Sequence, residues 1–310
     1  MLDLELIFPY VRRVQLKRDN SLSGQWQDFD HVLTFLASGS AEFVIEGVQY
    51  QIKEGDAVLM PPYSHHIITS EGRDAPLVQY NIHFDFFSDP YRMTLPYRDV
   101  WNERVGKAIP DAEQMLGGKV LLASLNNSTQ RMMRRFFLLM FDEYTKNAEY
   151  SLEMERGLLL CVLSVFLRSL KNTPPVSAEP KMIGTRSWTH ISAAIDYIGE
   201  HYSDPSLSNT DIGAAVGVSP VYLTTEFKKC FGVSLHRYLV NLRLDRASNM
   251  LLSGMYSVAD ISRMTGFSSI QAFSKAFRAS QGVGPREYAN THVSKSYDVF
   301  YSKRDKIKQR

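Results

Sequence analysis

An internal repeat in the C-terminal third of the chain constrains the fold more than any other feature. The run at 211–219 matches the run at 260–268 at an offset of 49, with Ile, Gly and Ser at corresponding positions. From Phe227 onward, a Phe, a Gly and a Tyr recur at an offset of 50. Each copy is expected to form a short helix, a turn that contains glycine and a second helix. Because a fixed period marks one structural unit built twice, the sequence predicts two helix-turn-helix motifs.

The second helix of each copy is predicted to have one apolar and one polar face. Ser219-Pro220 indicates the start of the first such helix, and the other is expected from about Ser268. In each, a pair of apolar residues four positions apart points inward. One long helix over 234–253 is predicted to join the two copies. The outward side chains are expected to be Val221, Thr224, Thr225 and Lys228 in the first helix, and Ile270, Gln271, Ser274, Lys275 and Arg278 in the second.

These outward side chains have the chemistry that reads DNA. The second helix of a helix-turn-helix enters the major groove. There Gln271 can pair bidentately with adenine, while Val221 and Ile270 suit contacts with thymine methyl groups. The basic members of the set suit phosphates, which give affinity without sequence choice. For any single side chain, the alternative is an ordinary solvated helix face.

The distribution of charge along the chain favours the same partner. Residues 1–180 hold 18 Lys+Arg against 23 Asp+Glu, whereas residues 181–310 hold 17 against 10. The C-terminal part therefore suits a polyanion and the N-terminal part does not. The sequence thus predicts double-stranded DNA as a partner of the C-terminal part.

The repeat also carries a recognisable set of residues: Gly217, Ser219, Leu223, Phe227, Lys228, Gly232, Arg243, Leu244, Ala247, Gly266, Phe267, Phe273, Phe277, Arg278, Gly282, Pro285 and Tyr288. In these residues the segment 206–289 resembles the DNA-binding domain of the AraC/XylS family of bacterial transcription regulators. Gly213 and Ser262 depart from the family's usual Ala, and Gly213 is expected to cost about 1 kcal/mol of helix stability relative to Ala. The resemblance implies a cupin-like sensor, a helical dimerisation segment, a homodimer and RNA polymerase as a further partner.

The N-terminal part is rich in short β-type runs separated by glycine and proline. The runs are His31–Ala37, Glu42–Ile45, Val48–Ile52, Ala57–Met60 and Leu77–Phe86. Short strands at near-regular spacing predict a sandwich or a barrel. The stretch from Tyr50 to His66 resembles the signature of cupins, over roughly residues 25–87. The predicted fold class is therefore multidomain α+β, with an N-terminal cupin-like β-barrel and a C-terminal all-α domain.

The domain division follows from these changes of pattern. Two helices, about 128–147 and 151–170, follow the strands, and the later one is apolar over much of its circumference. It is either sandwiched within its own domain or forms a homodimer interface on one face. The expected domains are 1–90 (cupin-like effector-binding domain with an N-terminal arm), 91–170 (helical dimerisation segment), 171–187 (linker), 188–291 (DNA-binding domain) and 292–310 (basic tail).

The histidines of the N-terminal part raise two alternatives to a plain structural role. Cupin enzymes hold a metal with a His-x-His pair, but here His65 and His66 are adjacent, so no metal and no cofactor are predicted. Polar residues alternate with apolar ones in the last predicted strand, and a polar interior face is costly unless water or a ligand satisfies it. The family resemblance implies a carbohydrate effector. The ligand-binding set is predicted to be His31, His66, Gln79, Asn81 and His83.

Two functions of different classes remain open from the sequence. The first is a transcription regulator, not an enzyme, whose DNA occupancy changes when a small molecule binds in the barrel. The second is a metal-dependent cupin enzyme fused to a DNA-binding domain, which metal analysis would separate from the first. No secretory signal is evident, and the apolar run 157–167 is too short to cross a bilayer, so a cytoplasmic protein is expected. Cys161 and Cys230 are expected to be reduced and buried.

Overall fold

The computed structural model describes residues 4–19, 23–26, 28–70, 77–94, 118–172 and 181–290. Contacts divide the chain into two compact units, with the main division between Lys181 and Met182 and the short segment Ser23–Gln25 assigned to the second unit. The predicted linker falls mainly on 173–180, outside the described residues, as do residues 95–117 of the predicted segment 91–170 and the whole of the tail 292–310. The first unit contains the β-strands and two long helices, and the second is helical. The expected fold class, α+β with an all-α C-terminal domain, is confirmed.

Five predicted strands are present with small changes at their ends. They are β3 (His31–Ser38), β4 (Ser40–Ile45), β5 (Val48–Lys53), β6 (Asp56–Met60) and β8 (Leu77–Asp85). Strands β2 (Ser23–Trp26), β7 (His66–Ser70), β9 (Leu121–Ser124) and β10 (Lys181–Met182) complete the set, with a 3-10 turn at Leu4–Leu6 and a short helix α1 (Pro90–Thr94). The expected N-terminal arm is largely a tenth strand, β1 (Tyr10–Asp19), which pairs antiparallel with β8. This strand was not predicted because the segment carries many charged residues, and it forms a strand by pairing with β8.

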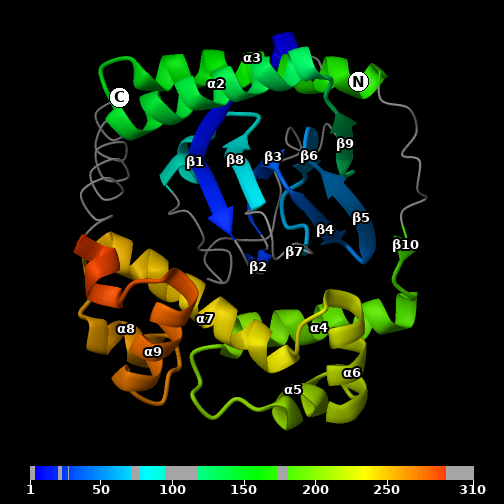
Figure 1. Cartoon of the computed structure of the whole chain (residues 1–310), viewed down its shortest axis with the longest axis vertical. Helices are drawn as coiled ribbons and strands as arrows, with labels where there is room; N and C mark the ends of the chain where they lie inside the picture. Colours follow the sequence, from blue (N-terminus) through cyan, green and yellow to red (C-terminus); the bar gives the residue numbers. More distant parts are fainter. Residues whose placement is uncertain are drawn as a thin grey trace. The chain divides into compact units, whose positions relative to one another are not determined.

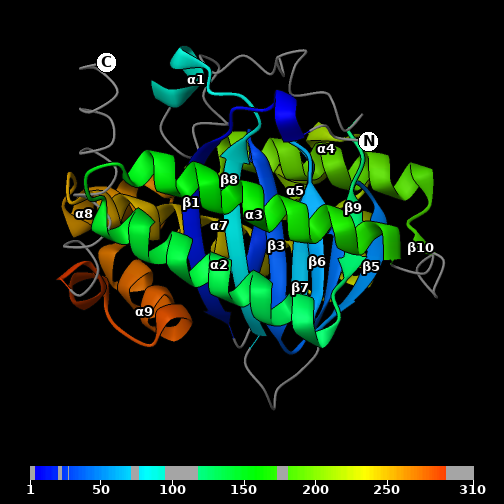
Figure 2. The same cartoon turned by 90° about the horizontal axis from the view of Figure 1, so that it is seen from above.

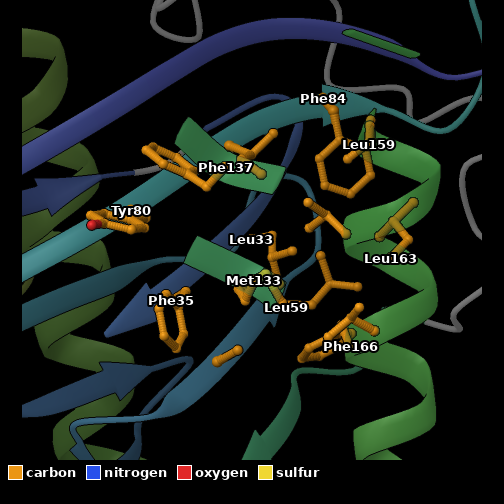
Figure 3. Close-up of a cluster of buried hydrophobic side chains, with 14 of the residues drawn as sticks. Leu33, Phe35, Leu59, Tyr80, Phe84, Met133, Phe137, Leu159, Leu163 and Phe166 are labelled. Carbon is orange, nitrogen blue, oxygen red and sulfur yellow. The ribbon is translucent and has the colours of Figure 1, made fainter. Parts of the chain in front are cut away.

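One face of the larger sheet is covered by two helices. This sheet has the order β1-β8-β3-β6-β9, and α2 (Asn127–Lys146) and α3 (Ser151–Asn172) lie across it (Figures 1 and 2). Register pairs Leu33 with Ile82 and Phe35 with Tyr80, so these side chains point to the same face. Figure 3 shows this core, in which the Tyr80 ring stacks on Phe137 with centroids 4.3 Å apart.

The opposite face of the same sheet is also buried. Val32 and Leu36 of β3 join Phe43 of β4 and Ile68 of β7 in a second apolar cluster. Strand β4 pairs antiparallel with both β5 and β7, and these three strands belong to the smaller sheet, of order β10-β5-β4-β7-β2, which supplies the other side of this cluster. Because the larger sheet is buried on both faces, any polar side chain on its inner face lies between the two sheets.

Helix α3 is packed within its own unit over most of its circumference. Leu159, Leu163 and Phe166 belong to the core against the sheet, and α2 lies alongside. This packing explains the wide apolar surface that was predicted for this helix. Cys161, expected to be buried, is exposed because it falls on the outer side of α3, whereas Cys230 is buried as expected.

The helices of the second unit begin with α4 (Thr185–His201). The predicted helices follow in the predicted order, and they are α5 (Asn209–Ala215), α6 (Pro220–Phe231), α7 (Leu235–Ser253), α8 (Val258–Met264) and α9 (Ile270–Gln281). Helix α5 begins with a capping box in which Ser208 and Asp211 bond each other's backbone N–H. None of the helices in the described part of the chain has the length and apolar character needed to cross a membrane.

Candidate DNA-binding and effector-binding sites

Helices α6 and α9 are built alike. Each has 12 residues and follows a serine that accepts a hydrogen bond from the backbone N–H three residues on, at 3.2 Å for Ser219 and 3.1 Å for Ser269. Each ends at a glycine with a positive φ, 69° at Gly232 and 77° at Gly282. Because both ends are satisfied in the same way, the two helices present equivalent positions to solvent.

The faces of α6 and α9 are oriented as the sequence predicts. The buried inward pairs are Leu223 with Phe227 and Phe273 with Phe277. The exposed outward side chains are Val221, Thr225, Lys228, Ile270, Gln271, Lys275 and Arg278, and the half-buried ones are Thr224 and Ser274. Val221 is 75% exposed and Ile270 is 45% exposed, although both are apolar and β-branched. Solvated apolar side chains at both helix starts are available for contact with a partner surface.

The two threonines of α6 use their hydroxyl protons inside the helix. Thr224 donates to the carbonyl of Pro220 at 2.8 Å, and Thr225 donates to the carbonyl of Val221 at 2.7 Å. In this conformation each hydroxyl offers an external group only its acceptor lone pairs. Tyr222, which the sequence reasoning left out, is also exposed on α6. Tyr222 could have been included from the sequence, because it follows Val221, which was already predicted to face outward on this first turn of the helix.

Arg243 and Gly266 connect the two helix-turn-helix motifs. Arg243, on the joining helix α7, donates from Nε to the carbonyl of Tyr202 at 2.8 Å and from a terminal nitrogen to the carbonyl of Asp204 at 2.7 Å. Gly266, in the turn of the second motif, has φ of 76°, and a Cβ there would overlap the Tyr202 carbonyl oxygen. The second turn therefore packs directly against the segment after α4, and Arg243 bonds that segment to α7.

A row of polar side chains runs along the inner face of the first unit's larger sheet. Register pairs His83, Asn81 and Gln79 of β8 with residues of β3 whose side chains lie between the two sheets. Gln79 is 1% exposed and Asn81 is 4% exposed. Neither the nitrogen nor the oxygen of the Gln79 amide makes a hydrogen bond to any described residue, and the same is true of Asn81 Oδ1. On β1, Arg13 and Lys17 are paired with members of the same row.

The row ends at a buried group of acids and imidazoles. His83 Nδ1 lies 3.3 Å from Asp30 Oδ1 and 3.9 Å from Asp28 Oδ1. His66 Nε2 lies 3.9 Å from the other oxygen of Asp28, while its Nδ1 is 3.0 Å from the carbonyl of Ser64. Burial, followed by the charge of Asp28, raises the pKa of Asp30 well above its usual value. Burial likewise lowers the pKa of His66, which favours its neutral form.

Sequence profiles match both units of the chain. The AraC-like ligand-binding domain matches residues 18–88, and a helix-turn-helix domain matches residues 212–291. The chain belongs to the AraC family.

Curated relatives of this AraC-family chain are regulators. The transcriptional regulator YobQ of Bacillus subtilis is 32% identical over 106 residues, which is 34% of this chain and 44% of that protein. The xylose operon regulatory protein of Escherichia coli K12 is 30% identical over 38% of this chain and 31% of that protein. The raffinose operon regulatory protein RafR of Pediococcus pentosaceus is 32% identical over 36% of this chain and 40% of that protein. The chain thus spans less than half the length of each of these relatives.

The AraC-like ligand-binding domain brings together four of the five predicted effector residues. His66, Gln79, Asn81 and His83 lie on faces between the sheets, but His31 does not. Register pairs His31 with Phe84 on the opposite face of the sheet, where the two rings stack with centroids 5.6 Å apart. Burial, with a smaller effect of Arg92, lowers the pKa of His31 to about 3. The structure therefore does not bring His31 together with the other four, because a one-residue difference in strand parity reverses the face.

The sequence reasoning also missed the charges that surround this site. Arg12 and Arg92 both bond Asp85, and Arg92 donates to the carbonyl of Phe29 at 2.7 Å. The Arg12 guanidinium lies 4.5 Å from the centre of the Phe29 ring. The only sequence signal was the run Asp28-Phe29-Asp30 immediately before a predicted strand, where acids two apart point the same way. A separate hollow of about 320 Å³ lies between the start of β1, α1 and α3 and contains none of the predicted effector residues.

Proposed function

We propose that the chain is a ligand-responsive transcription regulator that reads DNA with α6 and α9. The observation that carries this proposal is the shared construction of the two helices, with the same cap, length, exposed positions and terminal glycine. They belong to one compact unit in which α7 joins the two motifs, so their faces have a constant relation. Two recognition helices held in this way can enter successive major grooves, about 34 Å apart along the duplex.

Two variants on α9 can distinguish a residue that reads a base from a residue that binds a phosphate. Gln271 and Lys275 are both exposed and lie one turn apart on the same helix. On a duplex selected from a random pool, Gln271→Ala should cost about 1–3 kcal/mol at one base pair and little on random DNA. Lys275→Ala should weaken both duplexes and reduce the salt slope by about 1. Fluorescence anisotropy with the full chain measures both, and equal losses for Gln271→Ala on the two DNAs would refute its role in base reading.

The effector is proposed to be a carbohydrate bound between the sheets of the first unit. Buried amide groups that lack partners cost about 1–3 kcal/mol each, and hydroxyl groups of a sugar can satisfy the donor and the acceptor of Gln79 and the acceptor of Asn81. Relatives named for xylose and raffinose operons support this class of ligand.

A thermal unfolding screen of the full chain against mono- and oligosaccharides tests the effector. A sugar that binds should raise the melting temperature of the wild type but not of Asn81→Leu. Gln51→Leu is the matched control, because Gln51 is exposed and bonds Glu42 on the outer surface. The absence of any shift across the panel, or an unchanged shift in Asn81→Leu, contradicts a sugar site at this row.

The regulator is proposed to act as a cytoplasmic homodimer through α2, with RNA polymerase as a further partner. Met132, Leu138 and Leu139 on α2 are each more than 40% exposed despite being apolar. Effector binding would change which DNA half-sites the dimer occupies. Sedimentation velocity should show a dimer for the wild type and a larger monomer fraction for Leu138→Glu. A wild type that stays monomeric at high concentration would remove this part of the proposal.

A further inference from the structure

Three side chains of the first unit form a buried group with metal-ligand chemistry. One ligand atom from each of Asp28, Asp30 and His83 can be chosen so that all lie within 4.8 Å of one another. All three residues are buried, with Asp30 at 0% exposure. Ligands around one divalent ion at bond lengths of about 2.0–2.2 Å lie roughly 3–4.4 Å apart, so small movements of these side chains suffice.

The surroundings of the group resemble the outer shell of a metal site. His66 Nδ1 is 3.0 Å from the carbonyl of Ser64, which favours the tautomer whose Nε2 lone pair points toward Asp28. Such outer contacts orient ligands and fix imidazole tautomers in metal sites. Asp28 is thereby set between two imidazoles, His66 on one side and His83 on the other.

A second observation points to a bound group at this place. Asn81 lies on the same strand face as His83, and its buried Oδ1 has no hydrogen-bond partner in the described part of the chain. Asp30 Oδ2 likewise makes no hydrogen bond to any described residue, although Arg12 Nε lies 3.8 Å away. Burying a polar oxygen without a hydrogen bond costs free energy. Asn81 Oδ1 and Asp30 Oδ2 are two such oxygens at this group.

Charge balance favours a cation over an anion. The two arginines of the cluster bond Asp85, Arg12 Nε also lies 3.8 Å from Asp30 Oδ2, and Asp28 and Asp30 add two further acidic groups beside them. A divalent ion would neutralise this pair of carboxylates. Nitrogen and oxygen donors select Zn²⁺, Mn²⁺ or Fe²⁺ and disfavour Cu⁺, which prefers sulfur.

We infer that Asp28, Asp30 and His83 bind one divalent transition-metal ion, and that the unprotonated Nε2 of His66 faces the same group. Metal binding does not depend on DNA binding, but the site shares His66 and His83 with the predicted effector-binding set, so a bound ion would lie at one end of the proposed sugar site. Three protein ligands leave coordination positions open to water or to an oxygen of a ligand. The metal was not predicted from the sequence because the sequence lacks a His-x-His pair, and this group instead combines residues from before β3 with one from β8.

The test uses the full chain after removal of metals by a chelator. Isothermal titration with Zn²⁺ and, separately, Mn²⁺ should show one ion per chain, and the melting temperature should rise with the ion present. His83→Gln and Asp30→Asn should each lose both effects. His65→Gln is the matched control, since His65 is next to His66 but lies outside the group and contacts Glu46. It should bind as the wild type does.

A spectroscopic measurement on the wild type covers the case in which a variant does not fold. Co²⁺ added to the metal-free chain should give visible d–d absorption of an ion with imidazole and carboxylate ligands, and Zn²⁺ should displace it. The inference is overturned if the wild type binds no ion, or if the absorption spectrum of Co²⁺ added to the chain is the same as that of Co²⁺ in buffer. Equal binding by His83→Gln and His65→Gln overturns it as well. Failure of DNA binding or of sugar binding would leave these results unchanged.

Discussion

Gly217 and Gly266 occupy the same position in the two motifs, yet they should respond differently to the addition of a methyl group. Both have a positive φ, 73° and 76° respectively. Ala in this left-handed region costs about 1–2 kcal/mol, partly offset by about 0.4–1 kcal/mol from the less flexible unfolded chain. This backbone effect is common to Gly217→Ala and Gly266→Ala.

The surroundings of the two glycines separate the variants. A Cβ at Gly217 meets nothing within 4 Å. At Gly266 it would overlap the Tyr202 carbonyl oxygen, with the carbonyl carbon of Ser203 at 2.9 Å and Arg243 Nε at 3.0 Å. Overpacking of this kind costs about 1–3 kcal/mol more, because backbone atoms must move. We therefore expect Gly217→Ala to lose about 1 kcal/mol and Gly266→Ala about 2–4 kcal/mol.

Hydrogen exchange of the full chain measures both the size and the place of these losses. Gly266→Ala should speed exchange in peptides from the end of α4, from α7 and from α8, because all three meet at this contact. Gly217→Ala should affect only the α5–α6 turn. Urea unfolding followed by circular dichroism gives the free energies. Equal losses in the two variants would refute the claim that the second turn packs on the segment after α4.

Three further outcomes follow from particular contacts. Arg243→Met should destabilise the second unit by about 2–3 kcal/mol in urea unfolding, since two backbone carbonyls lose a charged donor, and Arg243→Lys should recover only part of this. Gly213→Ala should not return the helix-propensity gain of about 1 kcal/mol, because its Cβ would lie 2.9 Å from the Val218 carbonyl oxygen, and a higher melting temperature would contradict this reading. Hydrogen bonds from Ser208 lower the pKa of Asp211, so its stabilisation is complete above about pH 4 and is lost as the pH falls through the lower folded pKa. The melting temperatures of wild type and Asp211→Asn should converge on acidification, and a constant difference would argue against the capping role.

Local patterns were sufficient for most elements of this fold. Helices α6 and α9 follow from a capping serine, apolar residues four apart and a terminal glycine, all of which act within a dozen residues. Strands β3 to β6 and β8 follow from short apolar runs between turn residues. Strand β1 was not predicted because its sequence is dense in charge, and only pairing with β8 makes it a strand.

The residues of the candidate sites also differ in whether local sequence was sufficient to predict them. The outward residues of α6 and α9 could be named from the sequence because a helix presents its faces with a constant period. The inner row of Gln79, Asn81 and His83 could be named from alternation in one strand. His31 could not be placed in this way, because alternation states which residues share a face within a strand, but not which face of one strand matches that of the next.

The amino-acid sequence by itself determined the duplicated motif, the family and the side chains that each recognition helix presents. Tertiary structure alone decided that Gly266 packs on Tyr202, that Arg243 bonds α7 to the segment after α4, and that Asp28 and Asp30 meet His83. The physical reason is the range of the interactions. Caps, propensities and periodic faces depend on neighbours in the chain, whereas close approach and charge pairing depend on distances that only the folded chain sets.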